Sequence, residues 1–174
     1  GRIAVEKSFD KLLINTKKLL NENNDIKLLI VGDGPDIDNL KDLTKKLDIT
    51  NNVIFTGKVD YSLIPAYYNL FDVVATFSKS ETQGLTIIEG LAASKPTICI
   101  NDDSFKAMIT DNYNGYLFNS DEEFKDDILK LLTNKELYKQ MSNNARNSTY
   151  KYSKEVFASE VLKVYHNAIA NYKK

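Results

Sequence analysis

Short apolar runs alternate with segments of helical periodicity along most of the chain. The runs predict buried strands at 26–31, 53–55, 73–77, 96–100 and 116–118. Between them, apolar residues at helical spacing predict helices over 5–20, after Pro35, after a cap at Ser62, and over 84–94. Because this alternation is typical of βαβ units, we expect an α/β, Rossmann-like fold with a mainly parallel sheet and helices on both faces.

The pattern changes after residue 120, where strands cease and three helices are predicted at 121–132, 135–150 and 153–172. No repeat, low-complexity tract or linker rich in Pro, Gly or Ser divides the chain. A length of 174 residues is usual for one globular domain. We therefore expect a single domain over 1–174, with helices 121–172 at its C-terminal end.

Charge and composition exclude several classes of function. The chain carries 23 Lys and Arg against 24 Asp and Glu, so it lacks the basic field on which nucleic-acid binding depends. A single cysteine, Cys99, and a single histidine, His166, provide neither a disulfide framework nor a zinc site. No apolar run approaches the roughly 18 residues that span a bilayer. We expect a soluble cytoplasmic domain that binds no nucleic acid.

The segment after the predicted strand 73–77 carries the most informative chemistry. In open α/β sheets, ligands bind at the carboxyl ends of the strands, where helix N-termini converge. Gly84 permits close approach of the backbone to a ligand, and the amides of Gly84 and Leu85 begin a helix whose dipole attracts an anion. This segment therefore predicts a phosphate site.

Two carboxylates, Glu81 and Glu89, bracket the predicted phosphate site. Carboxylates repel phosphates, so their placement is explained if they accept hydrogen bonds from the hydroxyls of sugars. One sugar on each side of a phosphate group describes a nucleotide sugar. The alternative, in which Glu81 is solvated and Glu89 lies on a helix surface, stays open on spacing alone.

The spacing of Glu81 and Glu89, with seven residues between them, resembles the E-x7-E motif of family-4 retaining glycosyltransferases of the GT-B fold. The resemblance implies that Glu81 contacts the transferred hexose and that Glu89 contacts the ribose of the nucleotide. It also implies that the amides around Gly84 and Leu85 hold the diphosphate.

The opening residues 1–7 resemble the G-R-x3-E-K segment of the same family. The resemblance implies that Arg2 and Lys7 neutralise the diphosphate of the donor, which makes them candidate catalytic residues together with Glu81. Ser8 stands where the family commonly has Gly. The alternative is that this segment is a solvated tail.

Two further segments resemble family turns beside the donor. Residues 31–35 resemble a V-G-x-G-P turn, which implies that Gly32 lines the donor site, although a plain strand-to-helix turn explains it equally. Residues 55–59 resemble an F-x-G-x-V segment, which implies backbone contacts from Lys58 and Val59 to the nucleobase. The first of these turns is not a dinucleotide fingerprint, because Ile37 replaces the third glycine.

The resemblance extends from Gly1 to about Ile169 and corresponds to the donor-binding half of a two-domain enzyme. We expect the N-terminal acceptor domain, and the first strand of this half, to lie outside the chain. The last helix should then present an apolar face to that missing half. The expected partners are a nucleotide sugar and the missing acceptor domain, through which the enzyme would contact the inner face of a membrane.

The implied activity is that of a retaining hexosyltransferase, which moves a hexose from a UDP-sugar to a lipid or saccharide acceptor. Residues 80–86 resemble bacterial enzymes that glucosylate diacylglycerol, whereas Lys106 departs from a Glu common among relatives. The resemblance implies neither a cofactor nor a metal, and the chain alone is expected to be inactive. The alternatives are a GT-B epimerase or phosphorylase domain, or a nucleotide-binding module without catalysis.

Overall fold

The strands are short and parallel in the computed structural model, which describes residues 1–79 and 84–172. They lie in chain order at β1 (Leu28–Ile30), β2 (Val53–Phe55), β3 (Val74–Thr76), β4 (Thr97–Ile100) and β5 (Gly115–Phe118). β1 pairs with β2, and β3, β4 and β5 pair in that order. The expected α/β fold is confirmed, but the strands of the described part form two parallel sheets rather than one.

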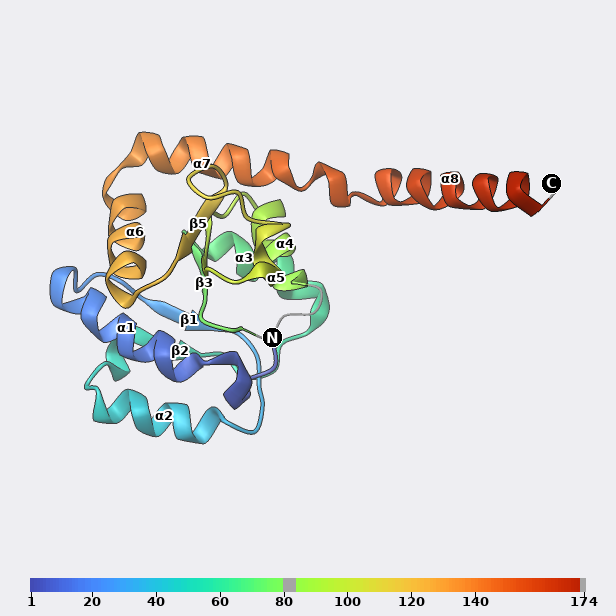
Figure 1. Cartoon of the computed structure of the whole chain (residues 1–174). Helices are drawn as coiled ribbons and strands as arrows, with labels where there is room; N and C mark the ends of the chain where they lie inside the picture. The colour runs from blue at the N-terminus through green and yellow to red at the C-terminus, as the bar shows by residue number, and fades with distance from the viewer. Residues whose placement is uncertain (80–83, 173–174) are drawn as a thin grey trace.

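Helices surround these strands (Figure 1). The α-helices are α1 (Phe9–Glu22), α2 (Ile37–Lys46), α3 (Ile64–Leu70), α4 (Leu85–Ala92), α5 (Asp103–Lys106), α6 (Asp121–Thr133), α7 (Lys135–Ser148) and α8 (Lys154–Tyr172). Short 3-10 helices lie at η1 (Val5–Lys7), η2 (Thr50–Asn52), η3 (Tyr61–Leu63) and η4 (Tyr150–Tyr152). The three helices predicted after residue 120 are confirmed as α6, α7 and α8.

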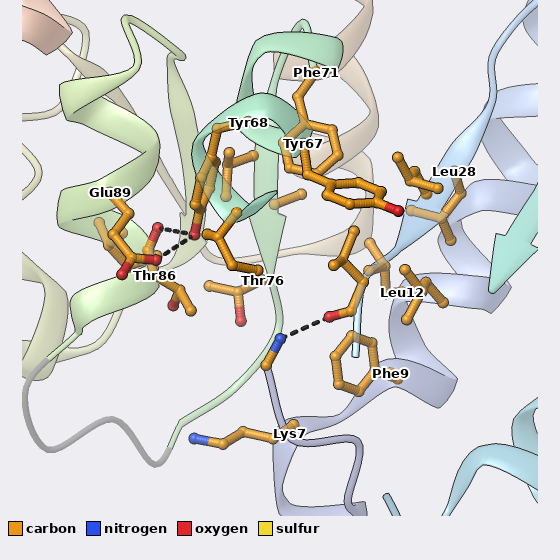
Figure 2. Close-up of a pocket in the computed structure, with 18 of the residues that line it drawn as sticks. Lys7, Phe9, Leu12, Leu28, Tyr67, Tyr68, Phe71, Thr76, Thr86 and Glu89 are labelled. Carbon is orange, nitrogen blue, oxygen red and sulfur yellow. Dashed lines mark hydrogen bonds between the residues drawn. The ribbon is translucent and has the colours of Figure 1, made fainter. Parts of the chain in front are cut away.

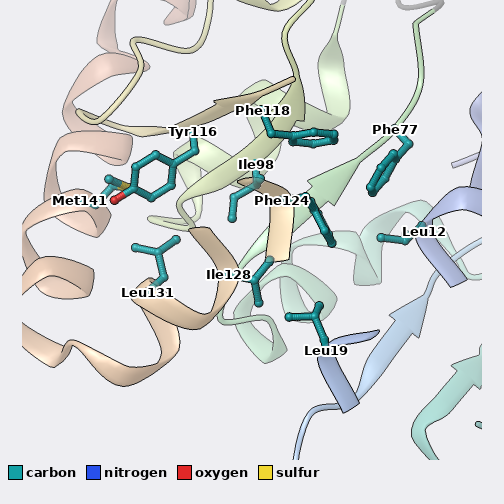
Figure 3. Packing of buried hydrophobic residues seen from close by; sticks show 10 residues of the cluster. All are labelled: Leu12, Leu19, Phe77, Ile98, Tyr116, Phe118, Phe124, Ile128, Leu131 and Met141. Carbon is teal, nitrogen blue, oxygen red and sulfur yellow. The ribbon is translucent and has the colours of Figure 1, made fainter. Parts of the chain in front are cut away.

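One face of β3–β5 packs against α1 and α6 around three phenylalanine rings, as Figure 3 shows. The ring centroid of Phe77 lies 4.7 Å from that of Phe118 and 4.7 Å from that of Phe124. Edge-to-face and tilted contacts at such distances stabilise aromatic clusters beyond the area they bury. Phe124 thus anchors α6 to the sheet.

The opposite face of the same sheet packs against α4 and α5. Neighbouring strand residues point to opposite faces, so Ile98 joins the phenylalanine cluster while Cys99 packs with Leu91 and Phe105. A third cluster lies between α1, α2 and the β1–β2 sheet, and it includes Leu13 and Leu40. The predicted coverage of both sheet faces by helices is therefore confirmed for β3–β5.

Helix starts differ from the sequence interpretation in two places. The predicted cap at Ser62 was wrong, because the side chain of Asp60 caps this segment by accepting a hydrogen bond from the Ser62 amide at 2.8 Å. The short helix α5 was not predicted, and it begins where the Asp102 side chain accepts a hydrogen bond from the Ser104 amide at 3.0 Å. In both places an aspartate lies directly before the helix, and its side chain accepts a hydrogen bond from the amide two residues later.

Helix α8 extends away from the rest of the chain in Figure 1 and buries none of its residues. Its exposed large apolar residues include Phe157, which is 69% exposed, together with Leu162, Val164, Tyr165, Ile169 and Tyr172. An exposed apolar surface on this helix was expected, and the exposure confirms it. Among the residues described, no helix combines the length and apolar character needed to cross a bilayer.

The helix predicted over 5–20 is interrupted at Ser8, which separates η1 from α1. Ser8 has a φ of 53° and a ψ of 40°, in the left-handed region where a Cβ atom is disfavoured. Glycine adopts this conformation without the steric cost. The left-handed conformation of Ser8 explains why the resemblance implies a glycine at this position.

We predict that Ser8→Gly stabilises the domain. Relief of the left-handed strain should contribute about 1 kcal/mol, which corresponds to a rise of about 2–4 °C in Tm for a domain of this size. Thermal unfolding followed by circular dichroism would measure the change. Ser8→Ala is the matched control, because it removes the hydroxyl and keeps the Cβ atom. An equal gain in both variants would contradict the backbone explanation.

Asp127 of α6 is partly buried, and this burial raises the pKa of its carboxyl to about 6. The negative charge of Asp111 adds to the effect, while Lys130 opposes it. The pKa in the unfolded chain is close to the ordinary 3.8, so the folded state binds the proton more tightly. Stability associated with this carboxyl is therefore present at low pH and is lost as the pH rises from about 4 through about 6.

We predict that Asp127→Asn stabilises the domain above this pH window and leaves its stability nearly unchanged below it. Solvent screens this half-exposed group, so we expect about 1 kcal/mol, or about 2–4 °C in Tm, at about pH 7.5. Unfolding by urea across the pH range would measure this difference. Asp25→Asn is the control, because Asp25 is exposed and is not among the charges that act on Asp127. A gain that does not vary with pH would exclude the titration of Asp127 as its cause.

Candidate functional site

The N-terminal segment lies alongside the chain that follows β1. The nitrogen of Gly1 donates a hydrogen bond to the carbonyl of Val31 at 2.7 Å, and the amide of Ile3 donates one to the carbonyl of Asp33 at 2.9 Å. Arg2 forms a parallel bridge with Asp33 between these bonds. This pairing holds Arg2, and η1 with Lys7, at the carboxyl end of β1.

Two glycines make the close pairing possible. A Cβ atom on Gly32, whose φ is 137°, would lie 1.8 Å from the carbonyl oxygen of Gly1. A Cβ atom on Gly34 would lie 2.0 Å from the carbonyl oxygen of Ile3. Contact between chain segments therefore accounts for both glycines. The predicted contact of Gly32 with a ligand stays a prediction.

Helix α4 begins at the residues predicted to bind phosphate. Gly84 is buried at its N-terminal cap and has a left-handed φ of 59°. A Cβ atom at Gly84 would lie 2.3 Å from the end of the Met108 side chain, so the glycine lets α4 start close to Met108, which follows α5. Leu85 is the first residue of the helix, and its side chain is 57% exposed. Amides in a first helical turn have no partner within the helix and favour an anion.

A pocket of about 310 Å³ brings predicted residues together from distant parts of the sequence (Figure 2). Arg2, Lys7 and Glu89 all line it, next to Thr86. Figure 2 shows Lys7 at the end of the pocket beyond Thr76, with Glu89 and Thr86 along one side. The pocket thus combines two cations and a carboxylate within one hollow. Arg2 is largely exposed, and its guanidinium lies 3.6 Å from the carboxylate of Glu6.

Glu89 accepts a hydrogen bond from the hydroxyl of Tyr68 at 3.0 Å. The same hydroxyl lies 3.1 Å from the backbone carbonyl of Thr86, and Tyr68 is buried. Burial raises the pKa of the Tyr68 phenol, and the negative charge of Glu89 raises it further. Tyr68 therefore stays protonated and orients the carboxylate of Glu89 as a hydrogen-bond donor.

The sequence interpretation did not single out Tyr68. Its partner Glu89 is 21 positions away on another helix, so no local spacing indicates the pair. A second pocket of about 420 Å³ also contains Tyr68 and Glu89 in its lining, together with Arg146 of α7. Arg146 was not predicted either, because only the packing of α7 beside α4 brings it to this site.

Within the described part of the chain, five predicted residues do not line these two pockets: Gly32, Lys58, Val59, Gly84 and Leu85. Lys58 is exposed and Val59 is half-buried. Both follow Gly57, whose carbonyl accepts a hydrogen bond from the Gly32 amide at 3.1 Å. Their proposed backbone contacts to a nucleobase stay predictions. Glu81, the predicted hexose contact, lies outside the residues that the structure describes.

Metal ligands do not gather in the described part of the chain, since no three side chains of His, Cys, Asp or Glu come together there. Asp36 and Asp38 are separated by one residue at the start of α2, and they too belong to no group of metal ligands in the described part of the chain.

The sequence model of the family described as glycosyl transferases group 1 matches residues 1–148. The chain belongs to this family. It is 37% identical over 172 residues to an alpha-monoglucosyldiacylglycerol synthase from Acholeplasma laidlawii, covering 97% of this chain and 42% of the relative. A synthase of the same name from Streptococcus pneumoniae is 35% identical over 132 residues, which cover 76% of this chain and 30% of the relative. The chain thus spans less than half the length of these two relatives.

Solved glycosyltransferase structures share the fold. A TarM variant from S. aureus, in complex with fondaparinux, alpha-GlcNAc-glycerol and UDP, matches with a TM-score of 0.87 and 26% identity over 94% of this chain and 34% of TarM. HepE from Anabaena, in complex with UDP, matches with a TM-score of 0.87 at 18% identity, over 96% of this chain and 47% of HepE. The C-terminal domain of LpcC from Francisella tularensis matches with a TM-score of 0.79 and 26% identity, over 88% of this chain and 84% of that domain. The fold is therefore that of a C-terminal GT-B half.

We predict that Tyr68→Phe destabilises the domain by about 1–3 kcal/mol, because the Glu89 carboxylate then loses the hydrogen bond from the Tyr68 hydroxyl. Urea denaturation would measure the loss. Tyr61→Phe is the matched control, since Tyr61 also borders the pocket but is 81% exposed. Equal, small effects in the two variants would show that the Tyr68 hydroxyl contributes nothing specific.

Proposed function

We propose that this chain binds a nucleoside diphosphate sugar, with UDP as the nucleotide, and forms the donor half of a retaining glycosyltransferase. One observation carries the proposal: Arg2 and Lys7 line the same pocket as Glu89, beside the N-terminal turn of α4. Cations and helix amides suit a diphosphate, whereas a carboxylate suits sugar hydroxyls. A nucleotide sugar presents both kinds of group.

Within this proposal, Glu89 accepts hydrogen bonds from the ribose. A carboxylate has about four acceptor positions, so the hydrogen bond from Tyr68 leaves capacity for two hydroxyls. Tyr68 would hold the carboxylate in place before the nucleotide arrives. Such preorganisation reduces the entropy lost on binding.

The reaction would transfer the hexose with retention of configuration. The acceptor hydroxyl forms a bond to the anomeric carbon while the bond from that carbon to the diphosphate oxygen breaks. The departing diphosphate oxygen keeps the electron pair and takes up the proton that the acceptor hydroxyl releases. Arg2, Lys7 and the amides at the start of α4 would stabilise the negative charge that develops on the diphosphate. Glu81 would contact the hydroxyls of the hexose, and no metal or cofactor would be required.

The acceptor in this proposal is a lipid or a saccharide. The two alpha-monoglucosyldiacylglycerol synthases support a lipid, and the TarM complex with alpha-GlcNAc-glycerol supports a hydroxyl acceptor more broadly. The acceptor would be held by a second domain packed against the exposed apolar residues of α8. Contact with the cytoplasmic face of a membrane would also occur through that second domain.

We predict that the chain binds UDP with a Kd in the micromolar to millimolar range and that Glu89→Ala weakens binding at least about tenfold. The loss follows from hydrogen bonds to a charged acceptor, each contributing about 1.5–3 kcal/mol. Isothermal titration calorimetry with UDP and UDP-glucose would measure both affinities.

Glu136→Ala is the matched control, since Glu136 is exposed at the start of α7 and away from both pockets. Thermal unfolding of each variant would verify that it folds. Unchanged UDP affinity in folded Glu89→Ala would overturn the ribose assignment. An epimer formed from UDP-glucose without any acceptor would favour an epimerase instead.

A further inference from the structure

Tyr61 is an aromatic residue at the rim of both pockets. Its side chain is 81% exposed, although it lines the pocket of about 310 Å³ and the pocket of about 420 Å³. Among the described residues, no other large apolar side chain that is exposed lines either pocket. A ring in this position can bury apolar area against a bound ligand without displacing any part of the protein.

The neighbouring tyrosines of α3 are already engaged within the protein. Figure 2 shows the ring of Tyr68 directed toward Glu89 and the ring of Tyr67 directed toward Leu28. The hydroxyl of Tyr68 is bonded to Glu89 and its ring is buried, so this ring presents little surface to a ligand. Tyr61 therefore offers the accessible aromatic face on this side of the site.

Glu89 lies at the junction of the two pockets. It lines both of them together with Tyr61, whereas Arg2 and Lys7 line the first pocket and not the second. The second pocket thus extends from Glu89 toward Tyr61 and away from the cations. A nucleotide has its groups in the same order, because the ribose lies between the diphosphate and the base. With the diphosphate at the cations and the ribose at Glu89, the base reaches Tyr61.

The backbone around Tyr61 is held in place by its neighbours. The carboxylate of Asp60 accepts a hydrogen bond from the Ser62 amide at 2.8 Å and another from the Ser62 hydroxyl at 2.5 Å. Ile64 follows Tyr61 at helical spacing and also lines both pockets, so an apolar side chain stands beside the ring. A tyrosine on a fixed backbone has only two side-chain torsions to order when a ligand binds.

We propose that the ring of Tyr61 stacks on the nucleobase of the donor, an inference that rests on the proposed binding of a nucleoside diphosphate sugar. Stacking uses the flat face of the base, which every nucleobase presents. Tyr61 therefore contributes affinity for the planar ring, and it does not select uracil by hydrogen bonding. Tyr61 thus acts on the base, while Glu89 acts on the ribose.

The experiment compares two ligands that differ in the planarity of the base. Isothermal titration calorimetry would measure binding of UDP and of 5,6-dihydro-UDP, whose base keeps both carbonyls and the N3 hydrogen but is no longer flat. We expect Tyr61→Ala to weaken UDP binding at least about fivefold. The variant should bind 5,6-dihydro-UDP nearly as well as the unsubstituted chain does, so the preference for UDP disappears.

Two variants serve as controls. Tyr61→Phe keeps the ring and should restore UDP affinity to within about twofold of that of the unsubstituted chain. Tyr150→Ala removes a tyrosine that is 73% exposed and lines neither pocket, so UDP affinity should not change. Thermal unfolding would verify that each variant is folded.

The outcomes separate this proposal from the proposed function. Unchanged UDP affinity in folded Tyr61→Ala would overturn the stacking and leave the donor site standing. Equal losses for UDP and 5,6-dihydro-UDP would also overturn it, because they would show that the side chain acts through the shape of the pocket. Absence of UDP binding by the unsubstituted chain would overturn the proposed function and the stacking together.

Discussion

The hydrogen bonds from Gly1 and Ile3 to Val31 and Asp33 are the contacts on which the candidate site depends. They bring the beginning of the chain to the carboxyl end of β1, 30 residues away in sequence. They are possible because Gly32 and Gly34 leave the space that Cβ atoms would fill. Without this pairing, the cations of the N-terminal segment would be separated from the carboxylate on α4.

The electrostatics of the site combine opposite requirements. A diphosphate needs cations and amide donors, whereas a ribose needs an acceptor that is itself anionic. The hydrogen bond from Tyr68 holds the Glu89 carboxylate in a defined position. A single pocket can then offer separate surfaces to the charged and the neutral parts of one ligand.

The exposed apolar residues of α8 and the open edges of β1 and β3 are two unsatisfied surfaces of different kinds. The α8 residues require apolar contact without direction, while the strand edges require hydrogen bonds at fixed spacing. The two surfaces therefore differ in the kind of contact that would cover them.

Local pattern was sufficient to predict most of the elements and the fold class, because burial in a βαβ arrangement imposes a visible period on apolar positions. The motif residues Arg2, Lys7 and Glu89 were also identified from the sequence. The sequence did not indicate Tyr68 or Arg146, since only the packing of separate helices brings the first into contact with Glu89 and the second to the lining of the same pocket as Glu89. Nor did it indicate that the described strands pair as two sheets, because strand neighbours are chosen by tertiary pairing rather than by the order of the chain.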